Sequence, residues 1–342
     1  MPNGRPHPSK NYLDNVSGVA DLSSTSTSLR RDFLKQGAAT WAGTLFLKMA
    51  SADGAESENP AVQKKSKNFI DTHVHVWTND LQKYPFSAGF ATEDMKPAAF
   101  LPADILRHAQ PSGVNRVVLV QMSYYGFDNS YMLDTIRQQP RVFRGIAVID
   151  WKANHPDEIM QELSREGVRG FRIYPGSDLP STWLDQPGFD KMFRCGAEKH
   201  LAMCPLINPD ALSSIGRQCE KYPRTPIVID HLGSVGEGRE IREADIRALC
   251  ALARYPEVKV KVSAFYALGK GEPPHLDLAP LIKRVYEAFG PHRLMWGSDC
   301  PFQTVKESYE DSISLIRDRL DFITPEDKQC ILRRTAEKFF FA

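Results

Sequence analysis

Short runs of hydrophobic residues alternate with amphipathic stretches from residue 69 to the end of the chain. The runs are as short as ordinary strands and are rich in Val, Ile and aromatic residues. This pattern predicts eight strands, at residues 69–76, 114–121, 143–150, 168–174, 201–207, 226–233, 258–265 and 293–299.

The stretches between these runs carry the signals with which helices begin and end. Two of them open with His or Asn before Pro and close at Gly167 and Pro223. The aromatic residues of segments 192–199 and 264–269 are expected to belong to the core. Helices are predicted within residues 102–109, 129–140, 155–167, 208–223, 243–256, 276–290, 305–320 and 324–340.

Strands that alternate with helices form βαβ units and a parallel sheet. Eight such units within residues 69–342 predict an α/β fold, a single (β/α)8 TIM barrel. An open, doubly wound sheet is the alternative, but the glycine-rich phosphate-binding turn of that fold is absent from the sequence. The segment 78–100 has no clear period and is long for a strand-to-helix loop, so we expect it to fold over the barrel mouth.

The chain before residue 69 has a different composition. Residues 1–29 are polar, and Arg30 and Arg31 then precede an uncharged, mildly apolar stretch at 36–47 and a small-residue site at 50–52. This order resembles a twin-arginine export signal, and the apolar stretch is too short to span a membrane. The alternative is a disordered tail with a chance pair of arginines.

The export signal predicts that the twin-arginine machinery is a partner and that the protein is exported, to a periplasmic or extracellular location. The predicted organisation is an N-terminal polar region with the signal at 1–52, a linker at 53–68 and the barrel at 69–342.

The overall composition excludes some classes of function. The 342 residues are 25% charged and 42% hydrophobic with a net charge of +1, which is typical of a soluble globular protein without an electrostatic preference for nucleic acid or an anionic membrane. None of the six cysteines forms a CxxC pair, so neither a disulfide scaffold nor a zinc ribbon is indicated. One or two disulfides remain compatible with export, and a homo-oligomer is compatible with the sequence.

The first strand carries an unusual set of polar residues. Residues two apart in a strand point to the same side, so Asp71, His73 and His75 are expected to share one face. A buried parallel strand normally has apolar residues on both faces. Two imidazoles and a carboxylate in such a place need partners, and a metal ion is one that satisfies all three.

Polar residues also occur at the ends of the other predicted strands, where TIM barrels have their active sites. His73, His75, His231 and Asp299 together are the ligand types of one Zn²⁺ or Mn²⁺ ion with room for water. The alternatives are a pair of core histidines, a rim histidine and a helix-capping aspartate. The other strand-end candidates are Gln121, Asp150, Arg172, Tyr174 and Lys261.

Three motifs carry a family resemblance. The segments DTHVHVW, IVIDHLG and RLMWGSDCP resemble the first-, sixth- and eighth-strand motifs of the amidohydrolase superfamily, in particular its amidohydrolase-2 branch. That branch holds metal-dependent hydrolases of TIM-barrel fold, sugar and 2-pyrone-4,6-dicarboxylate lactonases, and related decarboxylases. Strand 4 lacks the metal-bridging lysine and strand 5 the metal-binding histidine of many members. The resemblance therefore implies a site with one metal, a weakly held metal or none.

The resemblance implies a hydrolase that attacks a lactone or a related ester-like carbonyl of a small organic acid or sugar derivative. Asp299 would be the general base, and His231 would bind the metal or the substrate. Arg172 suits a substrate carboxylate, although it could equally be an ion-pair partner of Asp150. Lys261 is either a substrate ligand or a buried partner of a strand-end acid. Gln121 and Tyr174 are further candidates for substrate binding.

Other roles and functions stay open at this level. Asp71 is expected to orient a histidine or to bridge backbone groups, and Cys300 to pack rather than to react. A metal-dependent decarboxylase of the same family is one alternative function. A secreted binding protein without catalytic activity is the other.

Overall fold

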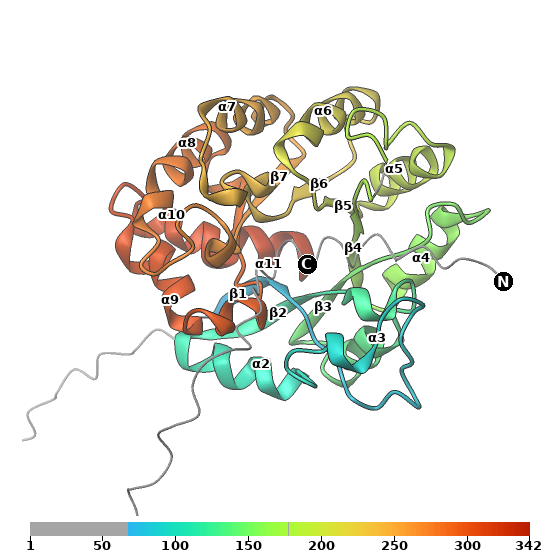
Figure 1. The fold of residues 1–342 in the computed structure, drawn as a ribbon. Coiled ribbons are helices and arrows are strands. Elements are labelled where there is room, and N and C mark those ends of the chain that lie inside the picture. The colour runs from blue at the N-terminus through green and yellow to red at the C-terminus, as the bar shows by residue number, and fades with distance from the viewer. Residues whose placement is uncertain (1–67, 177) are drawn as a thin grey trace, which may run out of the picture. The chain divides into compact units, whose positions relative to one another are not determined.

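The computed structural model describes residues 68–176 and 178–342. These residues form eight parallel strands that pair in sequence order, each with the next (Figure 1). The expected export signal and most of the linker lie outside the described residues. The strands are β1 Phe69–Val74, β2 Val114–Val120, β3 Phe143–Ala147, β4 Val168–Ile173, β5 Ala202–Pro205, β6 Ile227–Ile229, β7 Val258–Val262 and β8 Leu294–Trp296.

The first and last strands meet, which makes the sheet a nearly closed barrel and excludes the open, doubly wound alternative. A parallel bridge joins Val74 to Cys300, and backbone amides of His75 and Asp299 donate across the same seam to Cys300 and His73, at 2.9 Å each. All eight predicted strands are present, and each ends before the predicted residue because the chain turns away from the sheet where the polar side chains begin.

Helices follow the strands in the predicted alternation, and proline often occupies the first helical turn, where its missing N–H costs nothing. The sequence pattern delimits no helix between β4 and β5, and α5 (Pro187–Lys199) lies there. It buries Phe189, Met192 and Phe193, which confirms the expected core role of the aromatic residue in 192–199. The helices are α2 Pro102–Ala109, α3 Ser130–Gln138, α4 Pro156–Arg165, α5 Pro187–Lys199, α6 Leu212–Lys221, α7 Glu243–Ala251, α8 Ala279–Phe289, α9 Tyr309–Ser314, α10 Pro325–Gln329 and α11 Thr335–Phe340.

Two apolar clusters cover the two faces of the strands. In β2, Val117 and Leu119 belong to the larger cluster under the helices, whereas Val118 and Val120 belong to a smaller cluster inside the barrel. The C-terminal helix α11 adds Phe340 and its neighbours to the inner cluster. The barrel interior is therefore apolar at the end covered by α11, and its polar side chains gather at the opposite end of the strands.

Asp71 does not share the face of the two histidines, contrary to the period-two prediction. The pairing of β1 with β2 shifts register between Asp71 and Val74, and Ile70 points into the inner cluster. Such an irregularity changes which side of the sheet the following residues face. The Asp71 side chain consequently lies among Ser298 and Tyr309, beneath α9.

The buried Asp71 carboxylate ties β1 to the chain that follows β8. It accepts hydrogen bonds from the amides of His73 (3.0 Å) and Ser298 (2.9 Å), from Ser298 Oγ (2.5 Å) and from the Tyr309 hydroxyl (2.7 Å). Burial raises the pKa of Asp71 to about 6, although the hydrogen bonds from Ser298, His73 and Tyr309 act to lower it. The bridging of backbone groups expected for this residue is confirmed.

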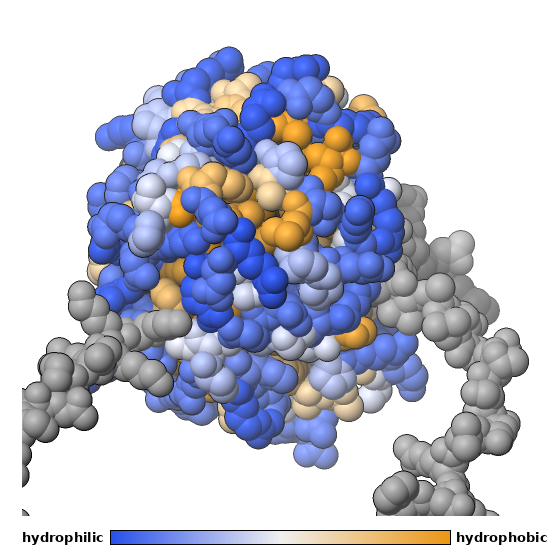
Figure 2. Space-filling view, turned by 90° about the vertical axis from the view of Figure 1, so that its left-hand side faces the viewer, coloured by the Kyte–Doolittle hydropathy of each residue, from blue (hydrophilic) through white to orange (hydrophobic). Residues whose placement is uncertain are grey.

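The long segment 78–100 packs on the C-terminal side of the strands. Its ends are joined by an antiparallel bridge between Trp77 and Phe100, and the amide of Ser87 donates to Tyr124 in the loop after β2. The face in Figure 2 is mainly hydrophilic, with hydrophobic residues in small groups. No helix among the described residues is long and apolar enough to cross a membrane.

The seam between β1 and β8 predicts a specific loss of stability. Replacing Tyr309 by Phe removes one donor from a buried carboxylate, and we expect the free energy of unfolding to fall by about 1.5–3 kcal/mol. Tyr286→Phe is the control, because the hydroxyl of Tyr286 donates to the half-buried Asp327 near the surface and should matter less. Urea unfolding measures both variants, and equal losses would show that the seam has no special role.

Candidate active site

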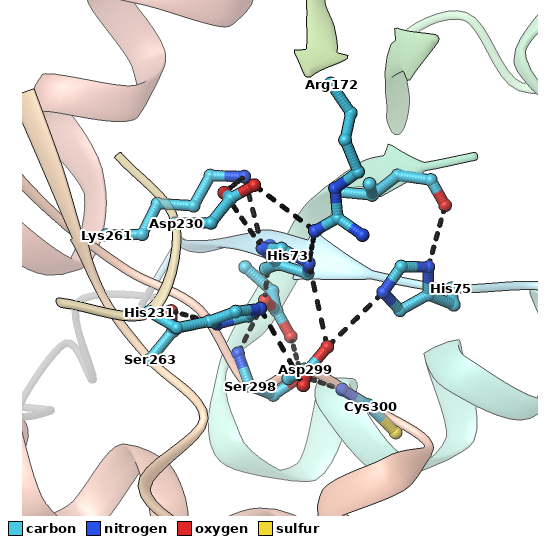
Figure 3. A network of polar contacts seen from close by, with 12 residues as sticks. His73, His75, Arg172, Asp230, His231, Lys261, Ser263, Ser298, Asp299 and Cys300 are labelled. Atoms are coloured by element: carbon cyan, nitrogen blue, oxygen red, sulfur yellow. Dashed lines mark hydrogen bonds and ion pairs between the residues drawn. The ribbon is translucent and has the colours of Figure 1, made fainter. Parts of the chain in front are cut away.

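His73 in β1 and His75 directly after it lie at the mouth end of the barrel, and Figure 3 shows both close to Asp299. Nδ1 of His75 is 3.0 Å from the carbonyl oxygen of Val120. A carbonyl only accepts hydrogen bonds, so Nδ1 carries the proton and the Nε2 lone pair is free. His75 Nε2 lies 3.3 Å from Asp299 Oδ1, so two hydrogen-bond acceptors face each other with no proton between them.

Asp299 follows β8 with a left-handed backbone (φ 64°), which turns its carboxylate into the barrel mouth. Oδ2 accepts a hydrogen bond from the Tyr266 hydroxyl at 2.7 Å. Oδ1 lies 3.3 Å from His75 Nε2 and 3.6 Å from His73 Nε2, and no described residue donates a hydrogen bond to it. Burial alone would raise the pKa of Asp299, but His231, His75 and His73 lower it well below its usual range, so the group is a carboxylate.

The donor set fits one divalent metal. His73, His75 and Asp299 offer one ligand atom each within 4.8 Å of one another, and Asp299 Oδ1 has a lone pair without a donor. Three of the four predicted ligands are therefore together. The fourth, His231, is outside this group of ligand atoms although its ring lies 4.2 Å from that of His73: its Nε2 is 3.9 Å from Asp299 Oδ2, and its Nδ1 pairs with Ser263 Oγ at 2.9 Å.

A buried ion-pair network lies behind His73 (Figure 3). Asp230, at the end of β6, holds Lys261 Nζ at 3.0 Å from one oxygen and Arg172 Nη2 at 3.2 Å from the other. Lys261 and Asp230 are fully buried. The network shows that Arg172 pairs with Asp230 and not with Asp150, whose carboxylate instead accepts the amide of Lys152 at 2.9 Å in its own turn.

Both ring nitrogens of His73 face cations of the network. Nη2 of Arg172 lies 2.8 Å from Nε2, and Lys261 Nζ lies 3.3 Å from Nδ1, which is also 3.3 Å from Asp230 Oδ1. A guanidinium only donates and makes the shorter contact, so it favours the tautomer with the proton on Nδ1. A metal at Nε2 would have to displace the guanidinium, so Arg172 opposes metal binding at this atom.

Burial and charge separate the protonation states of the site. Burial and the nearby Lys261 and His231 lower the pKa of His73 well below its usual value, while burial lowers the pKa of His231 to about 4. Burial would raise the pKa of Asp230, but Lys261, His73 and Arg172 hold it well below the usual range. At neutral pH His73 and His231 are therefore neutral imidazoles. They lie between the carboxylates of Asp230 and Asp299 and the cations of the network.

The remaining predicted substrate contacts lie around this centre. Lys261 has the second of its two expected roles, that of a buried partner of a strand-end acid. Gln121 is buried and its amide donates to the carbonyl of Asp128, which holds the loop after β2. Tyr174 is half-buried directly after β4. The substrate contacts of Gln121, Tyr174 and Lys261 stay predictions.

Two groups of this site were not predicted. Asp230 directly precedes His231 in the sixth-strand motif, so its place in the motif was an available signal. Tyr266 lies in a short turn after β7; it was expected only as a core aromatic residue, and it is buried, but its hydroxyl binds Asp299. Within the described residues all six cysteines are free thiols, and burial raises the pKa of Cys300 well above its usual value, in agreement with a packing role.

Comparison with known proteins finds relatives over the whole barrel. A model of the amidohydrolase family matches residues 70–342. An L-fucono-1,5-lactonase from Burkholderia ambifaria is 29% identical over 248 residues, which cover 71% of this chain and 83% of that protein. A 4-sulfomuconolactone hydrolase from Hydrogenophaga intermedia is 26% identical over 262 residues, covering 76% and 84%.

Among solved structures, a putative 2-pyrone-4,6-dicarboxylic acid hydrolase from Pseudomonas putida is similar with a TM-score of 0.68. It is 26% identical to this chain, and the match covers 80% of this chain and 97% of that one. The relatives thus share the barrel and much of its length.

The ion-pair network predicts that Lys261 stabilises the fold. Replacing Lys261 by Met leaves Asp230 with an incomplete set of cations, and we expect the free energy of unfolding to fall by about 3–5 kcal/mol. The Lys261→Met, Asp230→Asn double variant should recover part of that loss. Lys259→Met, on the same strand but paired with Glu257 at the surface-exposed end, is the control and should cost less. An unchanged unfolding midpoint in Lys261→Met would contradict this role.

Proposed function

The chain belongs to the amidohydrolase family, and on that premise we propose that it is a hydrolase in which Asp299 activates water for attack on the carbonyl of a lactone. The observation that carries the proposal is the buried Asp299 carboxylate with one oxygen bound by Tyr266 and the other facing the histidines without a donor. Three similar proteins are named as lactonases or lactone hydrolases, which supports the same class of substrate.

The reaction requires one proton to move twice. Asp299 Oδ1 would take a proton from water as the water oxygen bonds to the lactone carbonyl carbon. The ring C–O bond of the tetrahedral intermediate then breaks, and the protonated Asp299 returns the proton to the leaving alkoxide. The product is a hydroxy acid, and the enzyme returns to its starting state.

Arg172 would stabilise the negative charge that forms on the carbonyl oxygen. The guanidinium of Arg172 contacts His73 Nε2 at 2.8 Å, and 9% of the Arg172 side chain is exposed to solvent. Fixed donors in a water-poor site are well suited to stabilise an oxyanion because they need little reorganisation. His231, whose Nε2 points toward Asp299 and the mouth, would bind the substrate or complete a metal site.

One divalent ion, Zn²⁺ or Mn²⁺, is the proposed cofactor, with His73, His75 and Asp299 as ligands. When bound, such an ion polarises a carbonyl and lowers the pKa of a bound water. The Arg172 contact to His73 Nε2 favours weak binding. The proton transfer by Asp299 and the charge stabilisation by Arg172 come from the chain itself.

Replacing Asp299 by Asn tests the base. We expect kcat for lactone hydrolysis to fall about 10²- to 10⁴-fold, since an amide cannot accept the proton. The assay is a pH-indicator screen of sugar-derived and aromatic-acid lactones, with product mass in H₂¹⁸O to show that water enters. Asp150→Asn is the matched control, because Asp150 also follows a strand but its carboxylate is bound in its own turn. Full activity of Asp299→Asn would refute the proposal, and release of CO₂ without uptake of ¹⁸O would identify a decarboxylase.

Replacing His75 by Ala tests the metal. Elemental mass spectrometry of the protein purified without chelator should find up to one equivalent of Zn or Mn, and the variant should hold less than a tenth of it. Chelator treatment followed by addition of each metal then shows whether turnover depends on it. A metal content unchanged by His75→Ala would place the ion elsewhere.

Export through the twin-arginine machinery is proposed on the sequence of residues 30–52 alone. Replacing Arg30 and Arg31 together by Lys should leave the protein inside the cell, whereas the native chain appears in the periplasmic or extracellular fraction. Cell fractionation and immunoblotting measure this. Equal distribution of both proteins would contradict the signal.

A further inference from the structure

Tyr266 lies against the proposed base although nothing in the sequence pattern singled it out. It belongs to the short turn Phe265–Ala267 after β7, and its side chain is 3% exposed. Its hydroxyl donates to Asp299 Oδ2 at 2.7 Å. The other oxygen of the same carboxylate is the one that faces His75 and His73.

The backbones of the two neighbouring strand ends bring these side chains together. Ala264, which precedes the turn, and Asp299 both have left-handed backbones, with φ of 54° and 64°. For a residue with a Cβ this conformation costs on the order of 1 kcal/mol, so it persists only where surrounding contacts hold it. The two bends follow the paired strands β7 and β8, and the side chains of Tyr266 and Asp299 meet there.

Contacts on both sides hold the loop that carries Tyr266. The amide of Gly269 donates to Gly236 at 2.9 Å, which joins the loop to the segment after β6. On the other side, the buried His275 is hydrogen-bonded to Glu307, which belongs to the segment that follows Asp299 along the chain. The loop is thus anchored to both neighbours of its own strand, and Tyr266 has little freedom to leave Asp299.

We propose that Tyr266 is a positioning residue that binds Oδ2 of Asp299 and so presents Oδ1 to the water and the histidines. A carboxylate rotates readily about its last torsion, and without a donor at Oδ2 the proton-accepting oxygen would not stay in one place. Tyr266 itself takes no proton in the reaction. This assignment rests on the proposed role of Asp299 as the base.

Tyr266→Phe tests the proposal because it removes the hydroxyl and keeps the ring. We expect kcat for the best lactone to fall about 10- to 100-fold, as is typical when the partner of a catalytic ligand is lost, with KM changed less than about threefold. Tyr125→Phe is the matched control: Tyr125 is equally buried at the mouth, but its hydroxyl accepts the amide of Thr78 at 3.0 Å and is remote from Asp299 in the hydrogen-bond network. Its kcat should stay near that of the native enzyme.

A double-variant cycle separates positioning from direct contact with substrate. If Tyr266 acts through Asp299, Tyr266→Phe should cause no further loss in the Asp299→Asn background. Losses that multiply in the double variant, a rise in KM alone, or an unchanged kcat would each overturn the proposal. Equal urea midpoints for Tyr266→Phe and the native protein exclude loss of fold as the cause.

A crystal structure of Tyr266→Phe gives a readout that needs no turnover. The expected result is an Asp299 carboxylate in more than one orientation, or one turned away from the 3.3 Å contact between Oδ1 and His75. A carboxylate that keeps its single native orientation would overturn the proposal. If the native enzyme hydrolyses no lactone, the proposed function fails, but this structural result still decides the role of Tyr266.

Discussion

The buried carboxylate of Asp230 is the group on which the rest of the site depends. Lys261 and Arg172 bring two positive charges into the interior, where an uncompensated charge is very costly. Asp230 compensates both, and its Oδ1 lies 3.3 Å from His73 Nδ1. One carboxylate therefore permits both cations in the interior and keeps Arg172 beside His73.

Because buried charges need partners, the barrel interior is divided into an apolar end and a polar end. The end covered by α11 is closed by apolar side chains, which need no partners. The mouth end holds ion pairs and imidazoles at the strand ends, where packing resists small displacements, and it leaves Asp299 Oδ1 without a donor. The Asp71 carboxylate has a similar function at the seam between β1 and β8, because it binds the backbone on both sides of the place where the ring of strands closes.

The network also bears on how the site would treat a metal. His75 and Asp299 face each other with lone pairs, an arrangement that a cation or a proton relieves. Arg172, in contrast, already occupies the Nε2 lone pair of His73 with a positive charge. A substrate anion that draws the guanidinium away would free that nitrogen. Metal affinity and substrate binding are therefore expected to be coupled through Arg172.

The order of strands and helices and the residue types at the strand ends could be predicted from the sequence. Alternating strands and helices predicted the barrel, since each run repeats a local pattern, and the motifs predicted that His73, His75 and Asp299 meet. The sequence did not reveal which face of the sheet Asp71 occupies, because a register shift in β1 reverses the alternation of the strand. It also did not reveal the roles of Asp230 and Tyr266. The roles of Asp230 and Tyr266 depend on which strand ends lie close together in the barrel. They also depend on how residues with a left-handed backbone turn the chain after each strand. Only tertiary structure decides this, because the contacts join residues far apart along the chain.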